Sequence, residues 1–321
     1  MPFSHVRDDG TALIRYPDPH AREVRVTGSF CDWRTPGEAL GRAAHGFAGV
    51  VGPLPGGDVE YKLVVDGRWV ADPTNLASGR DGNSLLRNGS PHGGLHVGRF
   101  HAPALGEERG YAVYLPPGYA ASTRRLPVLY LLHGALDWER TWLEKGALAT
   151  TLDRLRSTGA IGELIVVMPA DNGGLFHGDT RVADYLARDL VGHVDAELRT
   201  LASPRHRALD GLSTGGFTSV LVGAWRTDTW RSIGSMSGCH DARSFEAIRT
   251  GAPAMRQADQ RYLVSCGSDE PQLGTCREVC RALDAAGVPN AWHEAPGAHE
   301  WPTWRAALER HVRFHWEHIA G

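Results

Sequence analysis

The hydrophobic pattern of this chain of 321 residues changes near residue 100, and the change limits the folds that the chain can adopt. Before that point, short alternating runs between turn residues predict β-strands, and no helical periodicity is present. After it, apolar strand-like runs alternate with segments of helical periodicity, which is typical of a parallel sheet covered by helices. We therefore predict two domains, a small all-β sandwich over residues 1–98 and an α/β domain over residues 99–321.

The predicted strands of the first domain share an alternation of apolar and polar residues that suits a half-buried strand. They cover residues 11–16, 23–29, 46–51, 59–66 and 68–71. Asp66-Gly67 joins the last two and predicts a tight hairpin, because both residues tolerate positive φ. The stretch 87–95 is rich in Gly, Ser, Asn and Pro and predicts a linker.

The second domain is predicted to alternate strands with helices. Strands are expected at 111–115, 128–132, 164–168, 206–209, 262–265 and 291–294, and helices at 147–156, 184–198, 217–224, 276–286 and 304–318. The strand at 128–132 is almost wholly apolar, so we expect it to be buried on both faces of the sheet.

The strongest functional signal is Gly211-Leu212-Ser213-Thr214-Gly215, a G-x-S-x-G motif between a predicted strand and a predicted helix. This context is that of a nucleophile elbow, in which a strained turn lifts a serine hydroxyl clear of the sheet. A Cβ at Gly211 or Gly215 would collide with neighbouring backbone in such a turn. The motif predicts Ser213 as a nucleophile on an α/β-hydrolase fold.

Acyl transfer at a serine requires backbone N–H donors for the oxyanion. The helix N-terminus after the serine offers the N–H of Thr214. The second donor is expected from the loop that follows the buried strand, where we assign Ala135, with Leu136 as the alternative. His133 lies on this side of the nucleophile, so we interpret it as a residue that shapes the turn.

The α/β-hydrolase order of serine, acid and then histidine directs the search for the remaining groups. His299 lies in a loop after the last predicted strand, where an imidazole can reach the carboxyl edge of the sheet. The acid is expected after the strand at 262–265, where Asp269 and Glu270 are adjacent. We prefer Glu270, and Asp269 is the alternative acid.

Several motifs of the second domain resemble those of one esterase family. They are the YLPPGY run (Tyr114–Tyr119), LLHG (Leu131–Gly134) followed by Trp142, VVMP (Val166–Pro169), GLSTGG, and H-x-W-x-x-W at His299, Trp301 and Trp304. Together they resemble the putative-esterase family, which includes enterochelin esterases, feruloyl and acetyl-xylan esterases, esterase D and the mycolyltransferases. The resemblance implies a triad of Ser213, His299 and a G-x-x-acid residue, which falls on Glu270. The loop Ala135-Leu136-Asp137-Trp138 is short, and many relatives have more glycines there. This difference leaves open which N–H completes the oxyanion hole.

The first domain carries a second resemblance. Its GSF-x-x-W segment ending at Trp33, its YK-φ-VVDG-x-W segment ending at Trp69, and Asp72-Pro73 resemble the early-set immunoglobulin-like module of glycogen-binding and branching enzymes. The resemblance implies a carbohydrate ligand, with Trp33, Lys62 and Trp69 as candidate contacts. The alternative is that these aromatic residues fill the core of the sandwich or an interface.

The predicted function is hydrolysis of a carboxylic ester through an acyl-enzyme on Ser213, on an aromatic or siderophore-type ester as in enterochelin esterases. The alternatives are a feruloyl or acetyl esterase acting on carbohydrate, transfer to an alcohol other than water, and a non-catalytic glycan-binding or scaffold protein. No cofactor or metal is required for this chemistry. Candidate pocket residues, for which ordinary packing is the alternative, are Trp138, Trp142, Asn172, Phe176, His240 and Trp301.

Charge and cysteine content bound the partners and the compartment. The formal net charge is -3, and the arginines are dispersed among acids, so nucleic acid and anionic membranes are not expected as partners. The N-terminal residues lack the basic and apolar regions of a signal peptide, and no apolar run reaches the length of a membrane span. Five cysteines, an odd number, favour reduced thiols and a cytoplasmic location.

Overall fold

A computed structural model describes residues 1–171 and 173–320 of the chain. The chain forms two compact units, the first made of residues 1–98 and 112–124, and the second of residues 99–111 and the remainder. The first unit thus takes in residues 112–124, which the sequence places in the second domain. The division between residues 98 and 99 stays a prediction.

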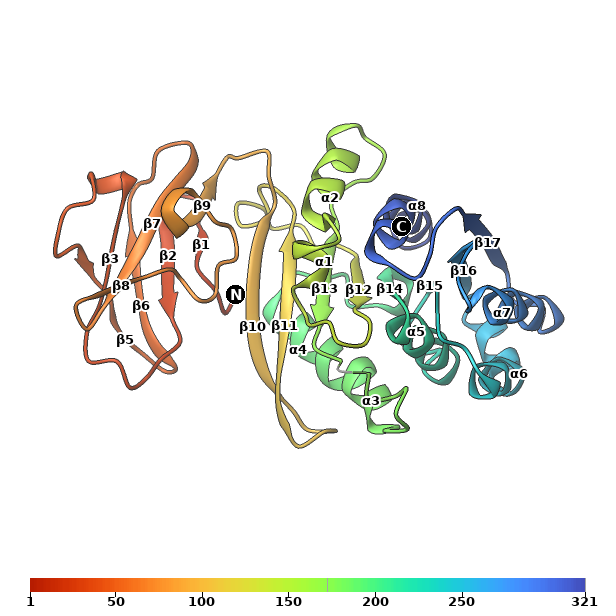
Figure 1. The fold of residues 1–321 in the computed structure, drawn as a ribbon. Coiled ribbons are helices and arrows are strands. Elements are labelled where there is room, and N and C mark those ends of the chain that lie inside the picture. The colour runs from red at the N-terminus through yellow and green to blue at the C-terminus, as the bar shows by residue number, and fades with distance from the viewer. Residues whose placement is uncertain (172, 321) are drawn as a thin grey trace. The chain divides into compact units, whose positions relative to one another are not determined.

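The first unit is a sandwich of two antiparallel sheets (Figure 1). One sheet has the order β1-β2-β6-β5, and the other has the order β4-β3-β7-β8, with β9 paired to β7. The strands are β1 (His5–Val6), β2 (Ala12–Tyr16), β3 (Val24–Gly28), β4 (Glu38–Ala39), β5 (Gly41–Ala43), β6 (Gly46–Val51), β7 (Gly57–Val65), β8 (Arg68–Val70) and β9 (Ser84–Asn88), with the short 3-10 helices η1 (Ser29–Cys31) and η2 (Arg80–Gly82).

One apolar core joins the two sheets of this unit. Ile14 of β2 and Val26, Tyr61 and Leu63 of β3 and β7 belong to it, and all four are fully buried. The turn between β7 and β8 has positive φ at both Asp66 (48°) and Gly67 (81°), as the hairpin signal predicted. The prediction of an all-β sandwich is confirmed.

The second unit is built on an eight-stranded sheet with the order β10-β11-β13-β12-β14-β15-β16-β17, in which residues 94–98 of β10 and 112–115 of β11 are assigned to the first unit. From β13 to β17 each strand pairs in parallel with its neighbour, which confirms the predicted α/β class. The strands are β10 (Gly94–Ala102), β11 (Glu107–Leu115), β12 (Val128–Leu132), β13 (Ile165–Pro169), β14 (Arg207–Gly211), β15 (Ser232–Met236), β16 (Arg261–Gly267) and β17 (Asn290–Ala295). Strands β12, β13 and β14 are buried along their whole length, so both faces of the sheet are covered.

Helices cover the two faces of this sheet, with α1, α2 and α8 on one side and α4, α5, α6 and α7 on the other (Figure 1). The helices are α1 (Thr141–Glu144), α2 (Leu148–Ser157), α3 (Arg181–Asp184), η3 (Tyr185–Leu190), α4 (Val191–Glu197), η4 (Pro204–His206), α5 (Thr214–Trp225), α6 (Ala242–Gln257), α7 (Leu273–Ala285) and α8 (Trp301–Ile319). The segment predicted as one helix at 184–198 is instead continuous with α3 and contains a π-helical stretch, η3. Among the described residues, no helix is long and apolar enough to cross a membrane.

Several elements were absent from the sequence-based expectation, among them β15 and α6. Strand β15 contains two serines and a glycine and therefore has no apolar run, although all its residues are buried. Helix α6 includes Gly251 and Pro253, which both have low helical propensity. The predicted linker at 87–95 is wrong in part, because it contains the end of β9 and the start of β10.

Candidate active site

Ser213 lies at a sharp turn between the carboxyl end of β14 and the start of α5. Its φ of 54° and ψ of -118° are a strained conformation for a residue with a side chain. Such strain persists only where the surrounding structure imposes it. The turn therefore has the geometry of a nucleophile elbow.

The two glycines of the motif are required by close backbone approach rather than by positive φ. A Cβ at Gly215 would lie 2.4 Å from the carbonyl oxygen of His133, and a Cβ at Gly211 would lie 2.6 Å from the carbonyl carbon of Gly215. Both distances are far below van der Waals contact. The predicted collision with neighbouring backbone is thus present at both positions.

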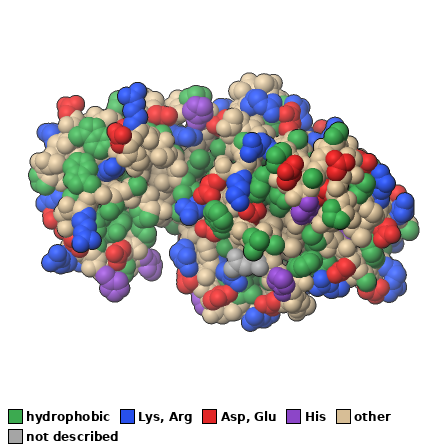
Figure 2. All heavy atoms as spheres, viewed as in Figure 1, with side chains coloured by type: hydrophobic (Ala, Val, Ile, Leu, Met, Phe, Trp, Pro, Cys, Tyr) green, Lys and Arg blue, Asp and Glu red, His purple; other side chains and the backbone are tan. Residues whose placement is uncertain are grey.

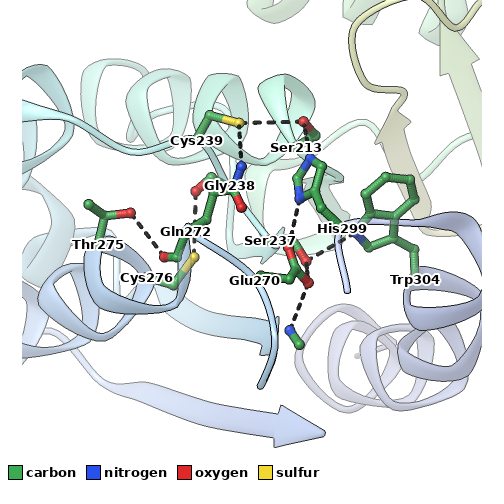
Figure 3. A network of polar contacts seen from close by, with 11 residues as sticks. Ser213, Ser237, Gly238, Cys239, Glu270, Gln272, Thr275, Cys276, His299 and Trp304 are labelled. Carbon is green, nitrogen blue, oxygen red and sulfur yellow. Dashed lines mark hydrogen bonds and ion pairs between the residues drawn. The ribbon is translucent and has the colours of Figure 1, made fainter. Parts of the chain in front are cut away.

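His299 connects the serine to a buried carboxylate (Figure 3). Its Nε2 lies 2.9 Å from Ser213 Oγ, and its Nδ1 lies 2.6 Å from Glu270 Oε2. The loop between β17 and α8 carries His299, and the turn after β16 carries Glu270. The structure therefore brings Ser213, His299 and Glu270 together at the carboxyl edge of the sheet.

Glu270 is held by donors on both of its oxygens. Oε1 accepts hydrogen bonds from the Gly267 backbone N–H at 2.8 Å and from Ser237 Oγ at 2.6 Å. Trp304, on the first turn of α8, donates its Nε1–H to Ser237 Oγ at 3.0 Å. The side chain of Glu270 is fully buried, and these donors compensate the desolvation of its charge.

Asp269, the alternative acid, lies apart from the imidazole. Its residue is exposed, and its Oδ1 accepts a hydrogen bond from Ser268 Oγ at 3.0 Å. Of the two adjacent carboxylates, only Glu270 contacts His299 among the described residues.

The loop after β12 lies directly beside the serine. A Cβ on Gly134 would be 2.6 Å from Leu212 Cδ1 and 3.2 Å from Ser213 Cβ, so a side chain there would displace its neighbours. Ala135 follows in this loop, and Thr214 is the first residue of α5. Leu136, the alternative donor, has a φ of 65° and a side chain that is 98% exposed.

His133 is buried and fixes the base of this loop. Its Nε2 accepts a hydrogen bond from the Asp171 backbone N–H at 3.3 Å, so its proton is on Nδ1, which donates to the Gly134 carbonyl at 2.8 Å. The position suits a residue that shapes the turn. Burial raises the pKa of the neighbouring Asp171 carboxyl, while His133 and Arg109 oppose the shift.

The candidate pocket residues divide into core and surface. Trp142 is fully buried and donates Nε1–H to the Leu132 carbonyl at 3.0 Å. His240 is buried between Ser235 Oγ (3.0 Å) and Ser244 Oγ (3.2 Å), and burial lowers its pKa to about 4. Trp138 is 39% exposed and Trp301 is half-buried, so these two retain surface for a ligand.

The other two candidates are Phe176 and Asn172. Phe176 is half-buried and contacts Phe217 edge-to-face at 5.4 Å. Asn172 lies outside the described residues.

Sequence reasoning missed several residues of the site. Cys239 Sγ lies 3.4 Å from Ser213 Oγ, and the Gln272 side chain approaches that sulfur at 3.9 Å (Figure 3). Ser237 and Cys239 both follow β15, and carboxyl ends of parallel strands meet at one edge of a sheet. A prediction of β15 would have placed both residues at the site.

One further group of side chains has the composition of a metal site. Asp210, His311 and His315 place their ligand atoms within 4.8 Å of one another in the core.

On the face shown in Figure 2, acidic and basic side chains are interspersed over the surface of the second unit.

Comparison with known proteins identifies relatives of both units. Residues 102–315 match the family model described as "Putative esterase", and residues 11–88 match the glycogen recognition site of AMP-activated protein kinase. An endo-1,4-β-xylanase/feruloyl esterase of Xylanibacter ruminicola is 28% identical over 96% of this chain and 45% of its own length. An esterase of Mycobacterium tuberculosis is 28% identical over 63% of this chain and 54% of its own length. The chain thus spans about half the length of these curated relatives.

Solved structures share the fold of the second unit. A ferulic acid esterase matches with a TM-score of 0.65 and 23% identity over 72% of this chain and 99% of its own. The feruloyl esterase module of Clostridium thermocellum, solved with sinapinate, matches with a TM-score of 0.63 and 19% identity over 72% of this chain and 90% of its own.

Proposed function

The chain belongs to the putative-esterase family, and we propose that it is a serine-dependent carboxylic ester hydrolase with Ser213 as its nucleophile. One observation carries the proposal. The His299 imidazole lies within hydrogen-bonding distance of both Ser213 Oγ (2.9 Å) and Glu270 Oε2 (2.6 Å). This arrangement of nucleophile, base and orienting carboxylate is the one that serine hydrolases use.

The carboxylate decides which nitrogen of His299 is the base. Ionised Glu270 only accepts hydrogen bonds, so the imidazole proton is on Nδ1 and the Nε2 lone pair faces Ser213. As Ser213 Oγ attacks the ester carbonyl carbon, its proton passes to Nε2. The imidazolium that forms is stabilised by Glu270.

The negative charge on the carbonyl oxygen requires N–H donors beside Ser213. We assign the backbone N–H groups of Thr214, which follows the serine, and of Ala135, which follows Gly134 in the loop beside the serine. The N-terminus of α5 adds the positive end of a helix dipole at the same place. His299 then returns the proton to the leaving alcohol, and a water molecule activated by Nε2 hydrolyses the acyl-enzyme. The reaction needs no cofactor.

Aromatic side chains next to His299 support an aromatic acyl group as the preferred substrate. The ring centroids of His299 and Trp304 are 4.9 Å apart, and those of Trp304 and Trp301 are 5.5 Å apart. Lys145 Nζ lies over the rings of both Trp301 (5.9 Å) and Trp138 (5.3 Å). Trp304 is buried, but the half-buried Trp301 beside it retains ring surface for stacking next to the residue that contacts His299.

The first unit supports carbohydrate as the alcohol component. Trp33 and Trp69 stack at 6.3 Å with an interplanar angle of 27°, and Trp69 is 45% exposed. Lys62, the third candidate, donates to the Asp81 carbonyl at 3.1 Å. An exposed indole stacked on a half-buried one is unusual for a core and suits the apolar face of a sugar. We therefore propose an aromatic ester of a carbohydrate, with a siderophore-type ester as the alternative.

An ester panel tests the proposal. Wild type and Ser213→Ala are compared on p-nitrophenyl acetate and butyrate, methyl ferulate, a feruloylated arabino-oligosaccharide and a catecholate trilactone. We expect turnover of the ferulate esters by wild type and none by Ser213→Ala. Faster turnover of the trilactone would favour the siderophore-type substrate. Inactivity of wild type on every ester would contradict the proposed hydrolase function.

Binding to soluble glucan tests the first unit separately. Affinity electrophoresis in glycogen should retard wild type, and Trp69→Ala should lose the retardation because it removes the exposed ring. Val50→Ala, at a side chain that is 50% exposed, is the matched control and should be retarded as wild type is. Retardation without esterase activity would favour the non-catalytic glycan-binding protein.

A further inference from the structure

Helix α8 is bound to three neighbouring strands of the sheet by one buried cluster of polar side chains. His311 and His315 lie one turn apart on α8, and Asp210 lies on β14. Ser232 on β15 and Ser265 on β16 complete the cluster. All five residues are at most 3% exposed.

The hydrogen bonds of the cluster converge on one carboxylate oxygen. Asp210 Oδ2 lies 2.7 Å from His311 Nδ1 and 2.8 Å from His315 Nε2. Asp210 Oδ1 accepts from the Gly211 backbone N–H at 2.7 Å. The outer nitrogens, His311 Nε2 and His315 Nδ1, lie 2.8 Å from Ser265 Oγ and Ser232 Oγ respectively.

The core leaves space for this carboxylate and supplies its donors. A Cβ on Gly234 would lie 2.2 Å from the Asp210 carboxyl carbon, so the carboxylate occupies the space that a side chain on β15 would fill. Burial alone would raise the pKa of Asp210, but the two histidines bring it below its usual range. Burial lowers the pKa of His315. The Asp210 carboxylate only accepts, so His315 donates its Nε2–H to it, and Ser232 Oγ lies beside Nδ1.

Direct hydrogen bonding argues against a metal ion at the same place. A metal would need the lone pairs of His311 Nδ1 and His315 Nε2, whereas both nitrogens use protons to bond Asp210. Each ring nitrogen and both carboxylate oxygens already have a partner within the chain. The cluster is complete without an ion.

The ends of the two connected elements carry the reacting groups. Strand β14 ends at Gly211, two residues before Ser213, and α8 begins at Trp301, two residues after His299. We propose that Asp210, His311 and His315 are positioning residues that hold the Ser213 hydroxyl and the His299 imidazole at reacting distance. The inference rests on the proposed function, in which this distance is needed for proton transfer.

The first test removes the charge of Asp210. Asp210→Asn keeps the size of the side chain, but one of its two terminal atoms becomes an NH2 group. Depending on how the amide turns, that group faces either the imidazole donors or the Gly211 N–H. Because small displacements of reacting groups are costly, we expect kcat on methyl ferulate to fall by about 10- to 100-fold, with KM within about twofold of wild type. Asp195→Asn is the matched control, since it breaks the Asp195–Arg207 pair (2.5 Å) at the other end of β14 and should leave kcat unchanged.

A second test restores the donors without the imidazoles. In His311→Asn/His315→Gln the amide nitrogens replace Nδ1 and Nε2 as donors to Asp210, so we expect kcat within about threefold of wild type. His311→Leu/His315→Leu fills the space but has no donor, and should lose kcat as Asp210→Asn does. An equal loss of kcat in both double variants would overturn the proposal. So would one equivalent of metal that is bound by wild type and absent from His311→Asn/His315→Gln.

A measurement without turnover separates this proposal from the hydrolase itself. The His299 Nδ1 proton, in a short bond to Glu270, should give a downfield proton resonance that Glu270→Gln abolishes. We expect this resonance to move or vanish in Asp210→Asn and to stay unchanged in Asp195→Asn. If wild type is inert on every ester but the resonance still moves in Asp210→Asn, the positioning role is supported and the proposed hydrolase activity is excluded. If wild type is active and both Asp210→Asn and Asp195→Asn keep its kcat and its resonance, only the positioning role is excluded.

Discussion

At the scale of single residues, Glu270 has a demanding task, because its charge must persist in the core. Its side chain is fully buried, yet it faces an imidazole at 2.6 Å and accepts two further hydrogen bonds from Gly267 and Ser237. Each donor favours the ionised carboxylate, which fixes the tautomer of His299 and stabilises its cation. The charge of the side chain at position 270 should therefore affect the rate more than its size does.

Replacing the two adjacent acids tests this task. Glu270→Gln keeps the shape but can present an N–H to the imidazole, so we expect kcat to fall by about 10³- to 10⁴-fold, as loss of a tautomer-fixing carboxylate does elsewhere. Asp269→Asn changes an exposed side chain one residue away and should stay within about twofold of wild type. Steady-state kinetics on methyl ferulate measure both. A larger loss in Asp269→Asn would transfer the role of acid to that residue.

The residues that sequence reasoning could name are those with a motif or a fixed order along the chain. Ser213 has its glycines, and His299 and Glu270 follow it in the order expected of the fold. Ser237 and Cys239 have no such signal, since both follow a strand whose serines and glycine hide its burial. The choice between Asp269 and Glu270 depended on which carboxylate a turn directs inward, a property that only three-dimensional structure provides.

At the scale of elements, the strand–turn–helix unit around Ser213 is limited by backbone contact. The β14 strand and α5 helix approach the loop after β12 so closely that Gly215 has the His133 carbonyl where a Cβ would be, at 2.4 Å. The neighbouring atoms are backbone and cannot rotate away. An added methyl group must therefore displace an element.

Two glycine-to-alanine substitutions should have opposite effects on stability. Gly215→Ala inserts a methyl group into a fully packed turn, and we expect the free energy of unfolding to fall by about 1–3 kcal/mol. Gly192→Ala changes an exposed position in α4 with no atom within 4 Å of the new Cβ, and it should raise the free energy of unfolding by up to about 1 kcal/mol. Urea denaturation measures both, and a Gly215→Ala protein as stable as wild type would contradict the close approach.

Elements with a strong apolar period were predicted well, and elements with polar or helix-breaking residues were not. Helix α8 and strand β12 follow their patterns closely. Strand β15 is held by buried serines that bond His240 and His315, so its burial depends on partners far away in sequence. Helix α6 tolerates Pro253 because tertiary packing outweighs local propensity.

At the scale of the whole molecule, each unit contains a buried histidine that resists protonation. Burial lowers the pKa of His96, in the first unit, to about 3, and that of His240, in the second, to about 4. Their ordinary value is 6.5, so the unfolded chain takes up protons between pH 6.5 and pH 4 that the folded chain does not. The contribution of these two histidines to the free energy of unfolding is therefore fully present above pH 6.5, and it is lost as the pH falls through this window.

We expect the free energy of unfolding to be lower at pH 5.0 than at pH 7.5, with each of these histidines contributing about 2 kcal/mol to the difference. Asp210 adds nothing in this range, because its pKa is lowered and its contribution changes only below its unfolded pKa of about 4. Urea denaturation followed by tryptophan fluorescence at the two pH values measures the difference.

His240→Asn assigns part of that difference to one residue. Asparagine does not titrate, so this variant should lose about 2 kcal/mol of the difference between pH 7.5 and pH 5.0, although it is less stable than wild type at both. Ser244→Ala removes a partner of His240 but keeps the imidazole, so its stability should be lower by a similar amount at both pH values. If His240→Asn kept the full pH dependence of wild type, the imidazole would have to become protonated within the folded core without cost. That outcome is incompatible with the burial of His240 between two serine hydroxyls.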